Sequence, residues 1–335
     1  MPTPVFYIKA DGKDVTDNLR GVGITMTITD SEGLSADTLQ LEIDDIDGSV
    51  EAPRTGVVLN PIGGYEGNLR DFGLFIVDSV TYTGWPQKIS VDAKSVAAKS
   101  LAKQREPKAY PKKDFPTYGD IFQEVASSIG LTLKMDSKLK AIENQYEAQA
   151  EEDGLEFLTR ISGKINASVT VKAMNLVVAI KGAGRSASGA QLDRIRVAKG
   201  YNLLDYSVTE RDEPKHSEVE ATYYDRDKNE RASVSVSTGL EGPKFLIRSA
   251  FQNEAEAKEA AESQAKELTR MQGEATFTID GDPFAMAEAW ADVTGCRTRV
   301  DGEWRIRTVT HNFSSGSPYT NTLQCGTTSE EGGDE

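Results

Sequence analysis

Residues 24–29 read ITMTIT and residues 39–43 read LQLEI. Apolar and polar side chains alternate in both with a period of two, which is typical of a β-strand with one buried face. Residues 31–33, SEG, separate the two stretches, so a pair of neighbouring strands is expected. Similar short patterns stand at residues 5–8 (before the turn Asp11-Gly12), 74–77, 80–82 and 89–91. Many short strands divided by glycine, aspartate and proline indicate a β-barrel or sandwich over residues 1–104.

Residues 105–190 predict a small α/β module. Thr117 with Asp120 forms a helix-capping pattern before an apolar stripe that ends at Gly130, and Asp153 with Glu156 does the same for a second helix. The two expected stripes are Ile121, Val125 and Ile129, and then Leu155, Leu158, Ile161 and Ile165. Two strands, residues 168–171 and 176–180, are expected to pair across Met174-Asn175, and the glycine-rich residues 182–189 end the module as a loop.

Residues 191–328 return to strand patterns and predict a second β-domain. One helix interrupts it, with a cap at Asn253 and Glu256 and a stop at Gly273. Asp301-Gly302 is a strong hairpin signal. The last residues, 329–335, are acidic and are expected to fray.

The two β regions contain an internal echo. Residues 77–82 read VDSVTY and residues 306–311 read IRTVTH. If the regions are copies, Val80 and Val309 should occupy equivalent strand positions and point inward, and Asp78 and Arg307 should share that phase nearer the strand start. The predicted fold class is therefore α+β and β-rich, with two β-domains and an inserted small α/β module.

The composition places the chain among folded globular proteins, because 38% of its 335 residues are hydrophobic and 27% are charged. A net charge of −15 argues against wrapping nucleic acid, since phosphate binding needs cationic surface. No apolar run approaches the roughly 20 residues of a membrane span, and the N-terminus lacks a signal-peptide pattern. The chain is thus expected to be made and assembled in a cytoplasm, where Cys296 and Cys325 would be reduced thiols rather than the alternative, one disulfide.

Candidate chemical sites are few, and each has a simpler structural interpretation. His216 and His311 lack a second ligand at metal spacing. Residues 182–189 lack the ending of a phosphate-binding loop, and residues 44–48, DDIDG, fail the spacing of a calcium loop. Residues 151–153, EED, suit a helix start better than a glycosidase pair. No catalytic, cofactor-binding or metal-binding residue is assigned, and no cofactor is expected.

A basic cluster stands out in this acidic chain, and it is either a docking surface for an acidic neighbour or a solvated linker face. Its members are Lys99, Lys103, Arg105, Lys108, Lys112 and Lys113.

Four segments in order, residues 24–45, 118–131, 152–161 and 301–311, resemble the late control D family of contractile-tailed phages. The most specific is residues 152–161, EDGLEFLTRI, followed by a short β-hairpin. Asn166 stands where a glycine-type turn residue is expected, which affects only a local turn.

The resemblance implies a structural baseplate hub whose two β-domains are tail-tube-like barrels. Such hubs form a homotrimeric ring that adapts a sixfold tail tube to a threefold spike. The implied partners are the tail tube protein or a tube initiator, a separate central spike protein and other baseplate proteins; DNA would pass through the lumen without specific binding, and no membrane is involved. The implied location is the virion tail baseplate, assembled in the host bacterial cytoplasm.

Two other classes are compared with this one. A tail-associated cell-wall hydrolase would need a separate catalytic domain, and none is evident in the sequence. A transcription factor would need a helix-turn-helix with basic recognition residues, and the charge of −15 argues against it.

Overall fold

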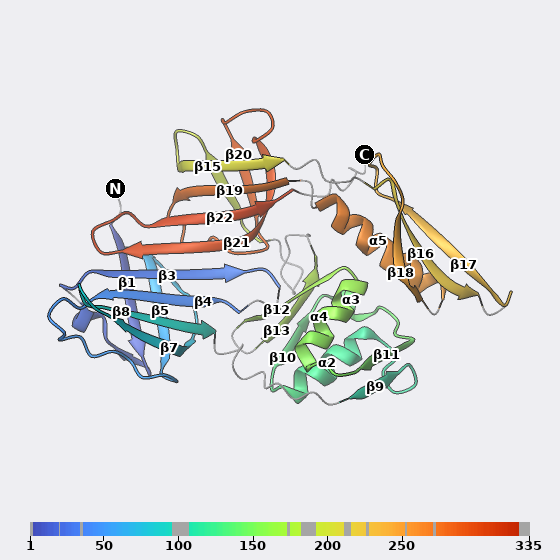
Figure 1. The fold of residues 1–335 in the computed structure, drawn as a ribbon, viewed down its shortest axis with the longest axis horizontal. Coiled ribbons are helices and arrows are strands. Elements are labelled where there is room, and N and C mark those ends of the chain that lie inside the picture. The colour runs from blue at the N-terminus through green and yellow to red at the C-terminus, as the bar shows by residue number, and fades with distance from the viewer. Residues whose placement is uncertain are drawn as a thin grey trace.

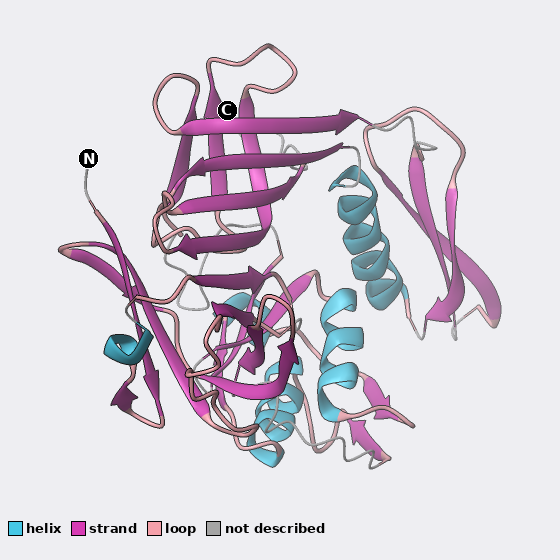
Figure 2. Cartoon of the chain, turned by 60° about the vertical axis from the view of Figure 1, so that its left-hand side comes forward, coloured by secondary structure: helices cyan, strands magenta, loops and turns pink. Residues whose placement is uncertain are grey.

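The computed structural model describes residues 3–327 apart from 20, 34–35, 96–106, 173–174, 182–191, 211–215, 226–227, 252 and 271–272. It is β-rich, and its largest sheet has 14 strands. Figure 2 shows that strands predominate over helices. No helix in the described ranges is long and apolar enough to cross a bilayer.

The first β unit covers the N-terminal strands and the short 3-10 helix η1 (Thr16–Leu19). Its strands are β1 (Pro4–Ala10), β2 (Lys13–Asp14), β3 (Ile24–Ser31), β4 (Thr38–Asp44), β5 (Val58–Tyr65), β6 (Asn68–Asp71), β7 (Phe75–Thr83) and β8 (Lys88–Ser95). The predicted alternation of β3 and β4 is confirmed, because Met26 and Leu41 are buried opposite each other while Thr27 and Gln40 face the other side.

The α/β module has its own hydrophobic core, in which Phe122, Phe157 and Ile161 are fully buried. Its elements are β9 (Lys108–Pro111), α2 (Tyr118–Ser128), β10 (Thr132–Met135), α3 (Ser137–Lys140), β11 (Tyr146–Gln149), α4 (Gly154–Lys164), β12 (Ala167–Lys172) and β13 (Asn175–Ile180). Both predicted capping boxes form, at Thr117 and at Asp153. The hairpin of β12 and β13 is confirmed, and β10 adds to it in parallel.

Asn166 precedes this hairpin in the left-handed conformation, with φ at 50°. Asparagine tolerates that conformation because its short polar side chain can bond locally, so the turn survives without glycine.

The second β unit comprises β14 (Arg194–Ala198), β15 (Leu203–Glu210), β19 (Gly273–Asp280), β20 (Trp290–Thr294), β21 (Gly302–Ser314) and β22 (Thr320–Gly326). The hairpin signal at Asp301-Gly302 falls on the antiparallel pair β20–β21, but these residues end a longer loop and do not form a tight turn by themselves. Residues 295–301 connect β20 to β21, and Asp301 uses its carboxylate to accept a hydrogen bond from the Cys296 amide at 2.8 Å. Both cysteines are free, and burial raises the pKa of the Cys325 thiol to about 12.

An arm leaves the second β unit between β15 and β19. It consists of β16 (Glu218–Asp225), β17 (Glu230–Ser237), β18 (Phe245–Phe251) and α5 (Glu254–Arg270), which pack around a separate small core. Asn253 accepts a hydrogen bond from the Glu256 amide at 2.9 Å, as the capping pattern predicts. Figure 1 shows the arm at one end of the molecule, away from the first β unit. The strand pattern of residues 219–224 thus belongs to a different sheet from that of residues 206–209.

The two predicted β-barrels are not separate in this chain. One sheet runs through both β units in the order β15-β19-β22-β21-β3-β4-β8-β7-β5-β1-β2, and the pairing of the described strands closes neither unit into a barrel. The seam between the units is the antiparallel pair β21–β3, which Figure 1 shows side by side. Backbone hydrogen bonds therefore join strands almost 300 residues apart in the chain.

The β units are nevertheless two copies of one design. In chain order, β1, β3, β4, β5, β7 and β8 of the first unit correspond to β14, β15, β19, β20, β21 and β22 of the second. The sheet order is also the same, β3-β4-β8-β7-β5-β1 in one and β15-β19-β22-β21-β20-β14 in the other. One difference is that β1 is antiparallel to β5 whereas β14 is parallel to β20.

The predicted echo falls on equivalent strands in the same register. Val80 lies opposite Val91 and Val309 opposite Leu323, and each packs on the core of its unit. The register shifts by one residue between Val77 and Ser79 of β7 and between Ile306 and Thr308 of β21. The equivalence of Val80 and Val309 and their inward direction are confirmed.

The prediction that Asp78 and Arg307 point to the same side of their strands as Val80 and Val309 is wrong, although Asp78 and Arg307 are equivalent to each other. Each is the extra residue of a β-bulge, which turns its side chain away from the core. Asp78 instead forms an ion pair with Lys94 at 2.8 Å on the opposite face, where Arg307 lies against Gly326.

Candidate functional site

The two histidines make structural contacts. His311 is fully buried, with Nδ1 2.7 Å from the Tyr319 hydroxyl and Nε2 3.2 Å from the Ala285 carbonyl. Burial and then the charge of Arg70 lower the pKa of His311 to about 3, so its ring is neutral. His216 packs edge-on against Phe245. Among the described residues no group of three or more His, Cys, Asp or Glu side chains is placed to hold a metal ion.

The acidic residues considered as candidate metal or catalytic sites also make local structural contacts. Asp45 accepts a hydrogen bond from the Val50 amide at 3.0 Å, and Asp47 accepts one from the Ser49 hydroxyl at 2.8 Å, so residues 44–48 form a closed turn. Glu152 pairs with Arg160 at 2.7 Å, and Asp153 caps α4. Both carboxylates thus take part in local contacts at the start of α4.

The basic cluster is partly neutralised within the chain. Lys108 pairs with Glu124 at 2.5 Å and Lys112 pairs with Glu143 at 2.6 Å, all four being well exposed. Such pairs suit a solvated face and contribute little to stability. Lys99, Lys103, Arg105 and the loop at residues 182–189 lie outside the described residues.

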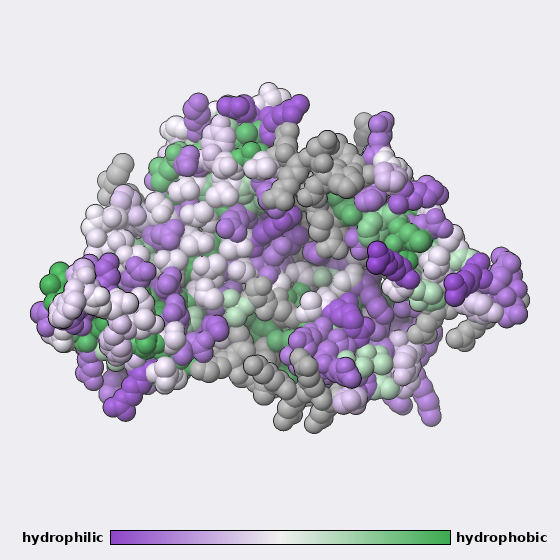
Figure 3. All heavy atoms as spheres, in the orientation of Figure 1, coloured by the Kyte–Doolittle hydropathy of each residue, from purple (hydrophilic) through white to green (hydrophobic). Residues whose placement is uncertain are grey.

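A continuous polar face of the large sheet is the most extensive surface feature that sequence inspection missed. Cross-strand neighbours share a face, and one row runs Thr38, Thr29, Thr310, Thr322, Thr278 and Asp205 across β4, β3, β21, β22, β19 and β15. The opposite face of the same strands carries the two hydrophobic cores. Figure 3 shows mainly pale residues of intermediate hydropathy over these strands, which Figure 1 locates.

The charges on this polar face are mostly negative. The exposed or half-exposed carboxylates are Glu42, Asp44, Asp78, Asp92, Asp205, Glu274 and Asp280, and the cations are Lys88, Lys94 and Arg307. Lys88 lies 3.4 Å from Asp44 and Lys94 lies 2.8 Å from Asp78. The face therefore offers hydroxyl groups and excess negative charge, which is a poor surface for phosphates.

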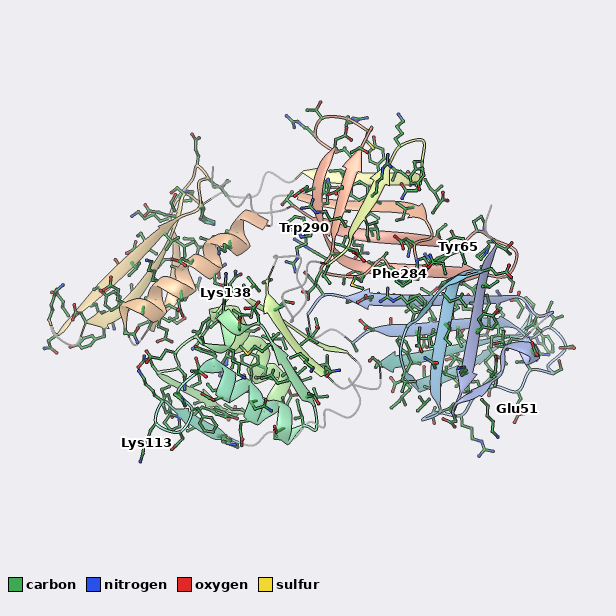
Figure 4. The ribbon with its side chains drawn as sticks, turned by 180° about the vertical axis from the view of Figure 1, so that it is seen from behind. Glu51, Tyr65, Lys113, Lys138, Phe284 and Trp290 are labelled. Atoms are coloured by element: carbon green, nitrogen blue, oxygen red, sulfur yellow. The ribbon has the colours of Figure 1, made fainter. Side chains whose placement is uncertain are left out.

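A buried junction fixes the two β units to each other beside the seam. Phe313 of β21 stacks on Tyr319 with ring centroids 4.0 Å apart, and both belong to the core of the first unit. Gly63 of β5 makes room for this, because a Cβ there would lie 2.6 Å from the Phe313 ring. Figure 4 shows Tyr65 and Phe284 close together at this junction, far from Glu51 at the outer end of the first unit.

Arg70 completes the junction from the first unit. Its guanidinium donates to the carbonyls of Pro283 at 3.0 Å and Ala285 at 2.8 Å, and it lies 3.7 Å from Asp30. Since Arg70 comes from β6 and its acceptors from the segment before β20, the contact sets the relative orientation of the units.

Comparison with known proteins agrees with the resemblance seen in the sequence. No family model matches the chain. Two curated relatives, each 26% identical over 96% of this chain and 92% of its own length, are the probable baseplate hub proteins of Escherichia phages 186 and P2. The resemblance to baseplate hub proteins is thereby confirmed.

Solved structures share the fold. The 43 kDa tail protein of prophage MuSo2 from Shewanella oneidensis matches with a TM-score of 0.67 at 16% identity, covering 96% of this chain and 97% of its own. An E. coli component of the type VI secretion system, described as structurally similar to bacteriophage T4 tail proteins, matches with a TM-score of 0.57 at 10% identity, covering 95% of this chain and 76% of its own.

Proposed function

We propose that this chain, which resembles the baseplate hub proteins of P2-like phages over nearly its whole length, is the structural hub of a contractile tail baseplate. Three copies would form a ring that adapts the sixfold tail tube to the threefold central spike. The observation that carries the proposal is the duplication of the β unit, with six equivalent strands in the same chain order and sheet order.

Duplication suits this adaptation for a geometric reason. Three chains with two similar β units each present six similar units in a closed ring, while the complete assembly keeps threefold symmetry. The tail tube protein or a tube initiator would meet the six units, and a separate spike protein and other baseplate proteins would bind elsewhere. The β units lie within residues 1–104 and 191–328, the second with the arm of residues 218–270 inserted in it, and the module of residues 105–190 would lie outside the ring.

The polar face would line the central channel. DNA passing through needs a wall that does not retain phosphates, and the threonine row with its excess of carboxylates is such a wall. The role is structural, without catalysis, and it belongs to the virion baseplate, assembled in the host cytoplasm.

The test is electron microscopy and mass measurement of the purified chain and of assembled particles. The expected result is a threefold ring with six similar β units around an open channel. A particle in which this chain sits outside the central axis, or a ring of another symmetry, would overturn the proposal.

A further inference from the structure

The edges of β7 and β15 are among the strand edges of the large sheet that lack a partner strand in the described part of the chain. β7 pairs with β8 along one side, but on the other side it meets β5 only around Phe75 and Ile76, which leaves Ser79–Thr83 uncovered. β15 ends the sheet, with β19 on its inner side and only the bridge between Lys199 and Leu203 on its outer side. Exposed strand edges promote pairing with another chain, so folded proteins usually cover or charge them.

The seam inside the chain shows how these same two edges can be filled. β21 is the equivalent of β7, and its residues Thr308–Ser314 pair with β3, which is the equivalent of β15. The inner seam thus joins the β7-type edge of one unit to the β3-type edge of the other. The remaining β7 and β15 edges are the two halves of a second seam of this kind, and they lie in different units of one chain.

We propose that residues 79–83 of one copy pair antiparallel with β15 of the next copy, in the register of the inner seam. This rests on the proposed function, in which copies of the chain form a ring. Each copy would offer one edge and receive another, so the contact is head-to-tail and a closed ring covers the β7 and β15 edges of every copy. The occupant of both edges is therefore a second copy of this chain.

The register follows from shared partners. Thr81 is opposite Ser90 as Thr310 is opposite Thr322, so Thr81 takes the place of Thr310. Thr29 faces Thr38 next to Lys94, and Thr209 faces Glu274 next to Gly326, so Thr209 takes the place of Thr29. Since Thr29 and Thr310 are opposite each other in the inner seam, Thr81 should lie opposite Thr209 of the next copy.

By the same shift Tyr82 should lie opposite Val208. Tyr82 is the counterpart of His311 and shares the apolar side of the sheet with Ile89, yet 69% of it is exposed where His311 is fully buried. Val208 is partly buried against the core of the second unit. Pairing would cover the Tyr82 ring with that core, which is a physical reason for an exposed aromatic residue on a free edge.

Cysteine cross-linking tests the register. In the inner seam, the hydrogen bonds from the Glu32 amide to the Arg307 carbonyl (2.8 Å) and from the Ser315 amide to the Ile24 carbonyl (2.9 Å) make Thr29 and Thr310 a non-hydrogen-bonded pair. Such pairs bring the Cα atoms to about 4.5 Å, within disulfide range. Under mild oxidation the variant T81C/T209C should therefore form disulfide-linked dimers and trimers. On a denaturing gel without reductant these species should appear as a ladder, and reductant should return them to monomers.

The matched control is T83C/T209C, which is two residues out of register on the same face and should cross-link at least tenfold less. Each single cysteine variant, T81C or T209C, measures how much cross-linking arises from the native Cys296 and Cys325. A second variant, Tyr82→Lys, should weaken self-association, whereas Tyr146→Lys, at a tyrosine 46% exposed in the α/β module, should not.

The outcomes separate this inference from the proposed function. Ring formation is measured independently, by mass in reducing buffer. A threefold ring in which T81C/T209C stays uncross-linked, or in which the control cross-links equally well, overturns the seam and leaves the hub role standing. A chain that forms no ring and no cross-link overturns both.

Discussion

Asp78 and Arg307 are the extra residues of the same β-bulge in the two copies of the repeated unit, and they carry opposite charges. Asp78 pairs with Lys94, and at the position equivalent to Lys94 the second copy has Gly326, over which the Arg307 side chain lies. The backbone irregularity is thus kept while the charged partner changes. A bulge shared at this position is stronger evidence for duplication than the six matching residues alone, because a chance echo would not reproduce a register shift.

Gly63→Ala should loosen the junction between the units. The added Cβ would lie 2.6 Å from Phe313, whose ring is held by stacking on Tyr319, so either β5 or the ring must shift. We expect a loss of about 1–3 kcal/mol of unfolding free energy, measured by urea denaturation. Gly163→Ala is the control, because nothing lies within 4 Å of a Cβ at that helical position. That change should be neutral or stabilise by up to about 1 kcal/mol; equal losses in both variants would contradict the steric argument.

Arg70→Met should separate the two β units more readily. It removes two hydrogen bonds to the Pro283 and Ala285 carbonyls and leaves Asp30 buried with less compensation. A loss of about 2–4 kcal/mol is expected from charged hydrogen bonds and a broken buried pair. The exposed Arg54→Met is the control, and differential scanning calorimetry is the measurement. If both variants melt like the wild type, the junction does not depend on Arg70.

Much of the local structure could be predicted from the sequence. Period-two alternation located β3 and β4, and the capping patterns at Thr117 and Asp153 located α2 and α4, because both signals depend on neighbours within a few residues. The strand β5 was missed since its sequence contains Pro61, Gly63 and Gly64, which ordinarily interrupt strands. Gly63 is required by Phe313, a residue 250 positions away, and no local pattern reveals that contact.

The arrangement of strands was harder to predict than their existence. Alternation at residues 206–209 and 219–224 predicts two strands but does not say that they belong to different sheets. The inner seam and the continuous polar face were likewise missed because both arise from the pairing of strands that are distant in the sequence. Each of these half-buried threonines is an ordinary polar residue of its own strand, and only the register brings Thr29, Thr310 and Thr322 into one row.

Lysines placed in this row should make the proposed channel retain DNA. In the double variant T310K/T322K, two cations per chain would stand on adjacent strands where the wild type has hydroxyls. We expect duplex binding that weakens steeply with salt, and fewer successful injections per particle, with unchanged folding. The control S233K/S235K adds the same charge to exposed positions of the arm strand β17. Equal DNA retention by both variants would mean that net charge, not the polar face, determines binding.

His311 should make the junction sensitive to acid. Burial and then Arg70 lower its pKa from about 6.5 to about 3, so the folded chain favours the neutral ring, which accepts at Nδ1 and donates from Nε2 to Ala285. A group whose folded pKa is lowered contributes full stability above its unfolded pKa, and that contribution falls as the pH drops from about 6.5 towards 3. The limiting slope is about 1.4 kcal/mol per pH unit. Urea unfolding at pH 7.5, 6 and 5 should therefore show a steeper loss for the wild type than for His311→Gln, which cannot gain a proton. The variant will be less stable at pH 7.5, so the difference between the two pH profiles is the quantity to compare, and parallel profiles would show that His311 is not the acid-sensitive group.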